Sequence, residues 1–483
     1  MNNEETIIFE KSVEGRLGAN LPNSEIPAID LTENIDNSLL RDKAAELPEI
    51  TEPQVVRHFI NLSTKNHHVD KNFYPLGSCT MKYNPKINDS IASMAGFAGL
   101  HPNQSEDSTQ GALKLMYELE QMLIKITGMS RVTLQPSAGS QGEFVGILIM
   151  RKFHEKNGEN RKYIIIPETA HGTNPASVIL GGFETRQVKS DERGRVDIEH
   201  LKSLVDSDVA GMMLTQPNTL GLFEDKIQEI SSIIHDVGGL MYMDGANLNA
   251  LVGLSRSADM GFDITHINLH KTFSTPHGGG GPGSGPIGVV ERLVSFLPNP
   301  MVEKKEDKFF FSCNSNDTIG HIHTFFGNFG ILVRAYIYIS TLGDEGLKNM
   351  TKMAILNANY LKHKLMHKYD IPYPDGTLHE FVASCLDQKK RGVKVLDIAK
   401  SLLDYGFHAP TIYFPTNIPE SMMIEPTESE TKETLDSFAQ TLIDINKKID
   451  TNIDSLKSAP FKTPVTRLDE TKANREPDLR WNK

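Results

Sequence analysis

Short apolar runs alternate with amphipathic stretches of helical period through the middle of this chain, from about residue 106 to residue 335. The region opens with an amphipathic stretch at 110–126, and strand-like and helix-like segments then come in turn. Strands that are separated by helices pair into a mainly parallel sheet with helices on both faces. Ligands of such sheets bind outside the carboxyl ends of the strands. The alternation therefore predicts an α/β core and the edge on which a site should lie.

Three other parts surround this core. Residues 1–105 form an irregular arm that is rich in Pro, Asn and Ser, with one helix-like stretch at 53–64. A smaller α+β domain is predicted at 336–448, and a tail with Pro460, Pro464 and a charged end extends over 449–483. The core itself, 106–335, is the candidate ligand-binding domain.

Composition excludes several classes of protein. With 39% hydrophobic and 23% charged residues, the chain has the composition of a soluble globular protein. A net charge of −12 argues against a general nucleic-acid binder and against binding to an anionic membrane surface. No apolar run is long enough to span a bilayer, and the amino terminus lacks the features of a signal peptide. The three cysteines show no CxxC or zinc spacing, which predicts a reducing, cytoplasmic location.

One lysine lies at the end of the strand-like run 264–269. Lys271 stands between His270 and Thr272, and a glycine-rich segment, 278–286, comes shortly after it. A strand would hold the lysine amine rigidly, and the glycines would let the backbone pass close to a bulky ligand. The pattern predicts a lysine that forms a Schiff base with pyridoxal phosphate (PLP). A surface lysine beside a flexible loop is the alternative.

An acid ends another apolar run, 240–244. PLP requires a carboxylate against its pyridine nitrogen, because the protonated ring is the better electron sink. Asp244 precedes Lys271 by 27 positions (271 − 244), which leaves room for one helix and one strand. Both residues would then lie at the same edge of the sheet. A helix cap or a metal ligand is the alternative role for Asp244.

The phosphate of PLP needs backbone N–H donors at the start of a helix. The strand-like run 132–136 is followed by residues 137–143, which lead into the apolar helical pattern 144–153. Gly139, Ser140 and Gln141 lie in this connection and are therefore candidate phosphate ligands. The same residues could be an ordinary helix N-cap.

Two more strand-like runs end in polar residues. His171 comes after the first and could stack on the pyridine face, or it could satisfy a buried carbonyl. Asn218 comes after the second and could donate to the 3′-oxygen of the cofactor. Five strand ends that carry suitable polar groups are hard to obtain by chance.

Several long motifs resemble the glycine decarboxylase P-protein family. The resemblance runs from about Tyr74 to Pro410 and beyond, and its motifs are His171–Ala176, Asp244–Ala250, Leu269–Phe273 with its glycine-rich sequel, and Tyr74–Asn84. It implies a PLP enzyme of fold type I, with a mainly parallel seven-stranded sheet and a smaller C-terminal α+β domain. The family occurs as one long chain or as two homologous subunits, and this chain is similar to the subunit that carries the lysine.

The resemblance also implies the reaction and the partners. The expected activity is decarboxylation of glycine with transfer of the aminomethyl group to the lipoyl arm of H-protein. The expected assembly is a heterotetramer with a subunit 1 that lacks the lysine. Lys271 would hold PLP, His171 would stack on the ring, and Asp244 would contact its nitrogen. Asn247 and His270 lie in matching motifs and are further candidate cofactor ligands.

The roles of two other residues stay open. His277 is the second choice, after Lys271, as a proton carrier. Cys79 lies in a matching motif and could line the site or sense redox state; a buried structural thiol is the other interpretation.

Other functions are compatible with some of these residues. A PLP aminotransferase or another amino-acid decarboxylase would keep the fold and hold the substrate carboxylate with an arginine, for which Arg334 and Arg391 are weak candidates. A non-catalytic scaffold subunit is disfavoured by Lys271. The pair His321 and His323 has strand spacing, which would put both rings on one face, but no carboxylate or cysteine lies at ligand spacing beside it, so no metal site is predicted. A GxGxxG match at 283–288 comes after no strand and is attributed to chance.

Overall fold

The computed structural model of the protein describes residues 5–19, 22–43, 45–277, 283–313 and 315–479. The chain forms two compact units. The main unit comprises residues 69–459, and the terminal unit comprises residues 1–68 and 460–483. Most of the glycine run that was expected to approach a ligand, 278–282, lies outside the described residues.

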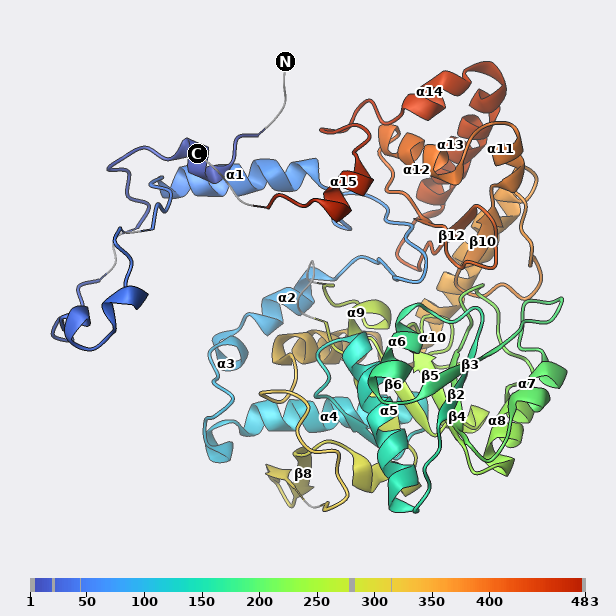
Figure 1. The fold of residues 1–483 in the computed structure, drawn as a ribbon, viewed down its shortest axis with the longest axis horizontal. Helices are drawn as coiled ribbons and strands as arrows, with labels where there is room; N and C mark the ends of the chain where they lie inside the picture. The colour runs from blue at the N-terminus through green and yellow to red at the C-terminus, as the bar shows by residue number, and fades with distance from the viewer. Residues whose placement is uncertain (1–4, 20–21, 44, 278–282, 314, 480–483) are drawn as a thin grey trace. The chain divides into compact units, whose positions relative to one another are not determined.

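A seven-stranded sheet lies at the centre of the main unit (Figure 1). The strand order is β1-β7-β6-β5-β4-β2-β3, and β7 runs in the direction opposite to the other six strands. The prediction of a mainly parallel sheet of seven strands is thereby confirmed. The strands are β1 (Arg131–Thr133), β2 (Tyr163–Pro167), β3 (Glu184–Val188), β4 (Val209–Thr215), β5 (Leu240–Gly245), β6 (Ile264–Ile267) and β7 (Ile287–Val289).

Both faces of the central part of this sheet are buried, because successive side chains of β2, β4 and β5 enter two different cores. On β5, Met241 and Met243 pack into one core, while Leu240 and Tyr242 pack into the other. Helices close both faces, as the alternating sequence pattern predicts. Those with residues in the first core are α4 (Gln110–Thr127), α7 (Ile198–Leu204), α8 (Ile227–Asp236) and α10 (Phe329–Leu365); those with residues in the second are α5 (Gly139–Lys156) and α6 (Thr173–Leu180).

The packing of α5 on the sheet depends on a glycine in the middle of the helix. A Cβ atom at Gly146 would lie 2.1 Å from Cε2 of Tyr242, whose ring is completely buried. We expect Gly146→Ala to lower the free energy of unfolding by about 1–3 kcal/mol, because overpacking forces the ring or the helix to shift. Urea unfolding measures the change.

Gly111 offers the matched control for this substitution. It lies in α4, and a Cβ atom there would have no neighbour within 4 Å. Gly111→Ala should therefore raise stability by up to about 1 kcal/mol through helix propensity alone. Equal effects of the two substitutions would contradict the packing argument.

The C-terminal part of the main unit contains a three-stranded antiparallel sheet of order β10-β12-β11. Helix α10 crosses residue 335, where the sequence predicted a domain limit, and its helical geometry breaks at Gly343. The strands and helices are β10 (Phe381–Ser384), α11 (Leu386–Lys390), α12 (Val395–Asp404), β11 (Thr411–Ile412), β12 (Ser421–Ile424), α13 (Lys432–Thr451) and α14 (Ile453–Ser458). The predicted domain limits stay a prediction.

Smaller elements complete the two units. The main unit also has α2 (Lys86–Ala92), α3 (Ala95–Ala98) and α9 (Leu269–Thr272), and a hairpin of β8 (Met301–Lys305) and β9 (Lys308–Ser312). The terminal unit contains α1 (Glu52–Lys65) and α15 (Glu470–Arg475). Among the described residues of the terminal unit many large apolar side chains are exposed, for example Leu17, Ile26, Leu39, Phe59 and Leu468.

Local structure departs from the expectations at three places. Lys271 lies on the one-turn helix α9, because β6 ends at Ile267 and the strand was predicted too long. Between Asp244 and Lys271 the chain forms β6 and a 3-10 helix, Ala258–Met260, where an α-helix was expected. Residues 321–323 form no strand, so the strand spacing assumed for the two histidines there is wrong. The predicted helices at 53–64 and 110–126 are confirmed as α1 and α4.

None of the helices in the described part of the chain combines the length and the apolar character that crossing a membrane requires.

Candidate active site

A cavity of about 270 Å³ lies where β4, β5 and β6 end. Polar side chains contribute much of its wall. The lining residues are Ser78, Gly139, Ser140, Glu143, His171, Thr173, Thr215, Pro217, Thr219, Asp244, Ala246, Asn247, Asn268, His270, Lys271, His379 and Glu380. Seven of the nine candidate residues belong to this set, and Gln141 and Asn218 do not.

The Lys271 side chain reaches the cavity from the first turn after β6. Its Nζ donates a hydrogen bond to the carbonyl oxygen of Ser78 at 2.7 Å. Ser78 has a φ of 66°, a backbone conformation that non-glycine residues seldom adopt and that occurs often at functional sites. The turn at Ser78 therefore fixes the position of the lysine amine.

Another lysine, Lys82, is buried but unsuited to forming an imine. Its Nζ lies 2.8 Å from Oε1 of Glu428 and donates to Oδ1 of Asn249 at 3.0 Å. Burial by itself would lower the pKa of Lys82, but Glu428 and Tyr338 raise it above its ordinary value. The Lys82 amine thus stays protonated, and it is absent from the cavity lining.

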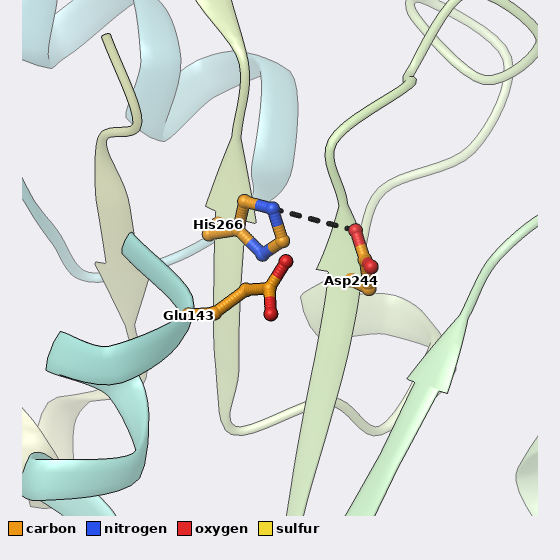
Figure 2. A group of neighbouring side chains, drawn as sticks. All are labelled: Glu143, Asp244 and His266. Atoms are coloured by element: carbon orange, nitrogen blue, oxygen red, sulfur yellow. Dashed lines mark ion pairs between the residues drawn. The ribbon is translucent and has the colours of Figure 1, made fainter. Parts of the chain in front are cut away.

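Asp244 is buried at the end of β5 and is held by three neighbours. Its Oδ2 accepts from Nδ2 of Asn174 at 2.9 Å, and its Oδ1 accepts from the Ala246 backbone N–H at 3.0 Å. Nε2 of His266, on the paired strand β6, lies 3.3 Å from Oδ1 (Figure 2). Burial opposes ionisation, but His266, Asn174, the Ala246 N–H and Lys271 together hold the pKa of Asp244 below its usual range. The acid is therefore a carboxylate at neutral pH.

Glu143 extends this polar network from helix α5 (Figure 2). Its Oε1 accepts from the Thr173 hydroxyl at 2.7 Å, and its Oε2 accepts from the Ser177 hydroxyl at 2.9 Å. Oγ1 of Thr173 lies 2.8 Å from Nδ1 of His171. The Glu143 carboxylate thereby connects the His171 ring to Asp244 and His266. One carboxylate oxygen of Asp244 and one ring nitrogen of His266 lie within 4.8 Å of a Glu143 carboxylate oxygen.

The start of helix α5 forms another side of the cavity. Gly139 and Ser140 occupy its first turn, and the N-cap residue, Ala138, provides no side-chain hydrogen bond. The unpaired N–H groups of such a turn attract an anion. A Cβ atom at Gly139 would lie 2.6 Å from the Asn268 amide, whose buried Oδ1 has no hydrogen-bond partner in the described chain. Only glycine leaves the helix start this close to the end of β6.

Two candidate residues have other tasks. Oε1 of Gln141 accepts from the backbone N–H and hydroxyl of Ser137, and its Nε2 donates to the carbonyl of Ile322. The Asn218 amide is fully used by other parts of the chain: Nδ2 donates to Gly194 O and to Glu224, and Oδ1 accepts from two backbone N–H groups of its own loop. The structure places neither side chain in the cavity lining.

The remaining candidates differ in where they lie. His270 and Asn247 belong to the lining. Nδ1 of His270 accepts from the Ser284 N–H at 3.3 Å, and burial, His277 and Lys271 lower the pKa of His270 to about 3. Asn247 donates to Oε1 of Glu425 at 3.0 Å. His277 Nε2 lies 2.9 Å from the carbonyl oxygen of Cys79, outside the lining set.

Sequence reasoning missed several residues of the site, and two of them are consecutive. His379 and Glu380 stand just before β10 and line the cavity. Oε2 of Glu380 accepts from the Ser78 N–H at 2.7 Å, while Ser78 O accepts from Lys271. A pair of polar residues before an apolar run was the only local signal. Arg334 bonds to Asp89 and Arg391 to Asp450, and neither lines the cavity.

The donor set suits PLP. A lysine amine, a carboxylate and an open helix start line one cavity, which matches the aldehyde, the pyridine nitrogen and the phosphate of the cofactor. The buried Oδ1 of Asn268 and Oγ1 of Thr215, which have no partner within the described chain, add polar atoms for a ligand to satisfy.

Fold and site together define an α/β protein of fold type I, the architecture of a large class of PLP enzymes. Among solved structures, a glycine decarboxylase P-protein in inhibitor-bound form has a TM-score of 0.73 at 19% identity, over 86% of this chain and 94% of that one. A glutamate decarboxylase from Lactobacillus brevis has a TM-score of 0.65 at 14% identity, over 87% and 97%. Identities this low show the fold alone.

Sequence comparison is more specific. The family model for the glycine cleavage system P-protein matches residues 25–309, and that for the C-terminal domain of glycine dehydrogenase matches 350–464. The protein named probable glycine dehydrogenase (decarboxylating) subunit 2 from Listeria monocytogenes is 54% identical over the full length of both chains. Its namesake from Bacillus licheniformis is 53% identical, also over both full lengths. The chain belongs to the glycine cleavage system P-protein family.

Proposed function

We propose that this chain is the PLP-bearing subunit of a glycine decarboxylase. In the proposed reaction glycine loses CO2, and its aminomethyl group passes to the lipoyl arm of H-protein. The observation that carries this proposal is the meeting of Lys271, Asp244 and the start of α5 in one cavity. The full-length relatives named for glycine dehydrogenase support the choice of substrate.

Each residue has a task in this proposal. Bound PLP supplies a conjugated, protonated ring that accepts the electron pair released when CO2 departs. Asp244, kept ionised by its neighbours, holds the proton on the pyridine nitrogen. The N–H groups of Gly139 and Ser140 bind the phosphate, and His171 packs against the ring.

Lys271 has two tasks. It attaches the cofactor, and its freed amine then moves protons at the substrate carbon while the Ser78 carbonyl holds it in place. His270 and Asn247 complete the cofactor-facing wall. Gln141 and Asn218 act on the loops that carry the site rather than on the cofactor itself.

A partner chain is part of the proposal. The relatives are named subunit 2, which supports a partner subunit 1. We propose that the two form a heterotetramer with two copies of each. Support comes from the terminal unit, where Ile26 and Leu39 are 78% and 76% exposed. Large apolar side chains that are exposed to solvent in this way are typical of surfaces that a partner covers. We place the assembly in the cytoplasm, with the cysteines reduced.

The test is carbon exchange between labelled bicarbonate and the carboxyl group of glycine. The chain is co-expressed with subunit 1 and supplied with PLP and lipoylated H-protein. We expect label to enter glycine only when all of these are present. The same H-protein without lipoate is the control. Exchange that is lacking in the complete mixture would contradict the proposed function.

A further inference from the structure

His379 is a buried histidine with no hydrogen-bond partner in the described chain. Its side chain is 1% exposed, and neither Nδ1 nor Nε2 makes a hydrogen bond. The residue nevertheless lines the cavity that contains Lys271. Buried polar groups are nearly always hydrogen-bonded, so an imidazole that faces a cavity without partners indicates a ligand.

The neighbour of this ring is a carboxyl group. Oε1 of Glu380 lies 3.5 Å from Nε2 of His379, and its Oε2 accepts from the Ser78 N–H. Glu425 brings a second buried carboxyl group close to His379 and Glu380, since a carboxylate oxygen of each acid and a ring nitrogen of the histidine lie within 4.8 Å of one another. The Glu425 oxygens accept hydrogen bonds from the Asn247 amide and from the Thr80 N–H. Two carboxyl groups this close cannot both ionise cheaply.

The charge state of this cluster depends on its surroundings. Burial, and then repulsion from Glu425, raise the pKa of Glu380 well above its ordinary value, and the closeness of the two carboxyl groups favours the protonated form of Glu380. Burial, and then the charge of Lys271, lower the pKa of His379 to about 3, so its ring is neutral as well. The wall near Lys271 thus presents an N–H donor and an O–H donor without a net positive charge.

We propose that His379 and Glu380 bind the carboxylate of the amino-acid substrate through these two hydrogen-bond donors. The proposal rests on the proposed function, and it names the residues that recognise the substrate. Among the described residues that line the cavity there is no arginine, and Lys271 is the only lysine. Since Lys271 is bound to the cofactor in this proposal, the substrate carboxylate has only neutral hydrogen-bond donors available.

Neutral donors suit a reaction in which the carboxylate leaves. An arginine would stabilise the full negative charge of the ground state, and this stabilisation would be lost as the charge moves away with bond breaking. Hydrogen bonds from neutral groups hold the same oxygens in place, but they stabilise the ground-state charge less, so less stabilisation is lost as the bond breaks. A site that retains the carboxylate, as in an aminotransferase, has no such constraint.

The other occupant to consider is a metal ion. One ligand atom each from His379, Glu380 and Glu425 could surround it. A cation would require ionised carboxylates, and the ammonium of Lys271 would repel it. The two occupants make opposite predictions for Glu380→Gln. Glutamine keeps an N–H donor and an oxygen for the Ser78 N–H, but it removes the charge that a metal needs.

The experiment measures binding of two amines that differ by the carboxylate. The chain is purified with subunit 1 and PLP, and the visible absorbance of the cofactor is titrated with glycine or with methylamine. We expect His379→Phe to raise the Kd for glycine about 10- to 100-fold, the loss of one hydrogen bond to a charged group, and to leave the Kd for methylamine within about twofold. Glu380→Gln should bind both amines almost as the parent does.

Three further variants test the interpretation. His379→Leu also lacks a donor and replaces the phenylalanine variant should that ring not fit; His379→Gln restores an N–H and should recover most of the affinity for glycine. His408→Phe is the matched control, because His408 is partly buried but lies outside the cavity lining. It should leave both Kd values unchanged.

The outcomes separate the two proposals. Unchanged glycine affinity in His379→Phe and His379→Leu, with a normal response to methylamine, would overturn the carboxylate assignment alone. Loss of glycine binding in Glu380→Gln together with loss of a bound metal, measured by elemental analysis, would overturn it in favour of a cation. A parent protein whose absorbance responds to neither amine would contradict the proposed function, and the assignment with it.

Discussion

Replacing Lys271 by alanine should abolish covalent attachment of PLP and slow glycine turnover by at least about 10³-fold, because the site would lose both its imine-forming amine and its proton carrier. Reduction with borohydride followed by mass spectrometry measures the attachment. The parent chain should carry the reduced cofactor on Lys271, and the variant should carry none. Carbon exchange with labelled bicarbonate measures turnover.

The arginine variant separates the positive charge at position 271 from the ability to form an imine. Lys271→Arg keeps a cation that can donate to the Ser78 carbonyl, yet a guanidinium does not form the imine. It should fold like the parent and lose attachment as completely as the alanine variant. Lys226→Ala is the control for an exposed lysine outside the cavity. Finding the cofactor on Lys82 in the parent protein would refute the assignment of Lys271.

Replacing Asp244 by asparagine is expected to lower kcat by roughly 10²- to 10³-fold, comparable to removing one preorganised electrostatic contact from an active site. Asparagine has the same shape, but it cannot hold a proton on the pyridine nitrogen by charge. The cofactor should remain attached, since Lys271 and the start of α5 are untouched. Single-turnover rates of glycine decarboxylation, corrected for the cofactor content, give the comparison.

Asp263 provides the matched control. It is also buried and lies 2.7 Å from a histidine, Nε2 of His235, but it does not line the cavity. Asp263→Asn should reduce stability and leave kcat per folded molecule near the parent value. If Asp244→Asn retained full kcat, the proposed electron-sink role of this carboxylate would be wrong.

Most of the fold could be predicted from local pattern. Helices α1 and α4 match their predicted ranges to within about two residues, because each is a long amphipathic stretch with clear ends. The short elements around Lys271 were predicted less well. One-turn helices such as α9 contain too few residues for a periodic signal, and the apolar Leu269 two residues beyond the true strand end made the strand look longer.

Some residues of the cavity could likewise be predicted from the sequence, and others could not. Lys271, Asp244 and His171 lie at or just beyond the ends of apolar strands, so the rule that parallel strands end at one edge was enough to bring them together. Asn218 satisfied the same rule, yet its amide is fully occupied by hydrogen bonds to Gly194, to Glu224 and to two backbone N–H groups of its own loop. Strand-end position predicts the edge, but not the direction in which a side chain points.

By itself, the sequence determined the α/β class, the parallel sheet and the lysine and acid at its edge, because these depend on the period of apolar residues and on the residue types at each strand end. Only the tertiary structure decided that His266 pairs with Asp244 and that Glu380 meets Ser78 beside Lys271. Glu380 and Lys271 are 109 positions apart along the chain (380 − 271), and no local pattern encodes a contact at that separation. Strand register and the hydrogen bonds at the turn of Ser78 bring these residues together, and the resulting burial sets the charge of the site.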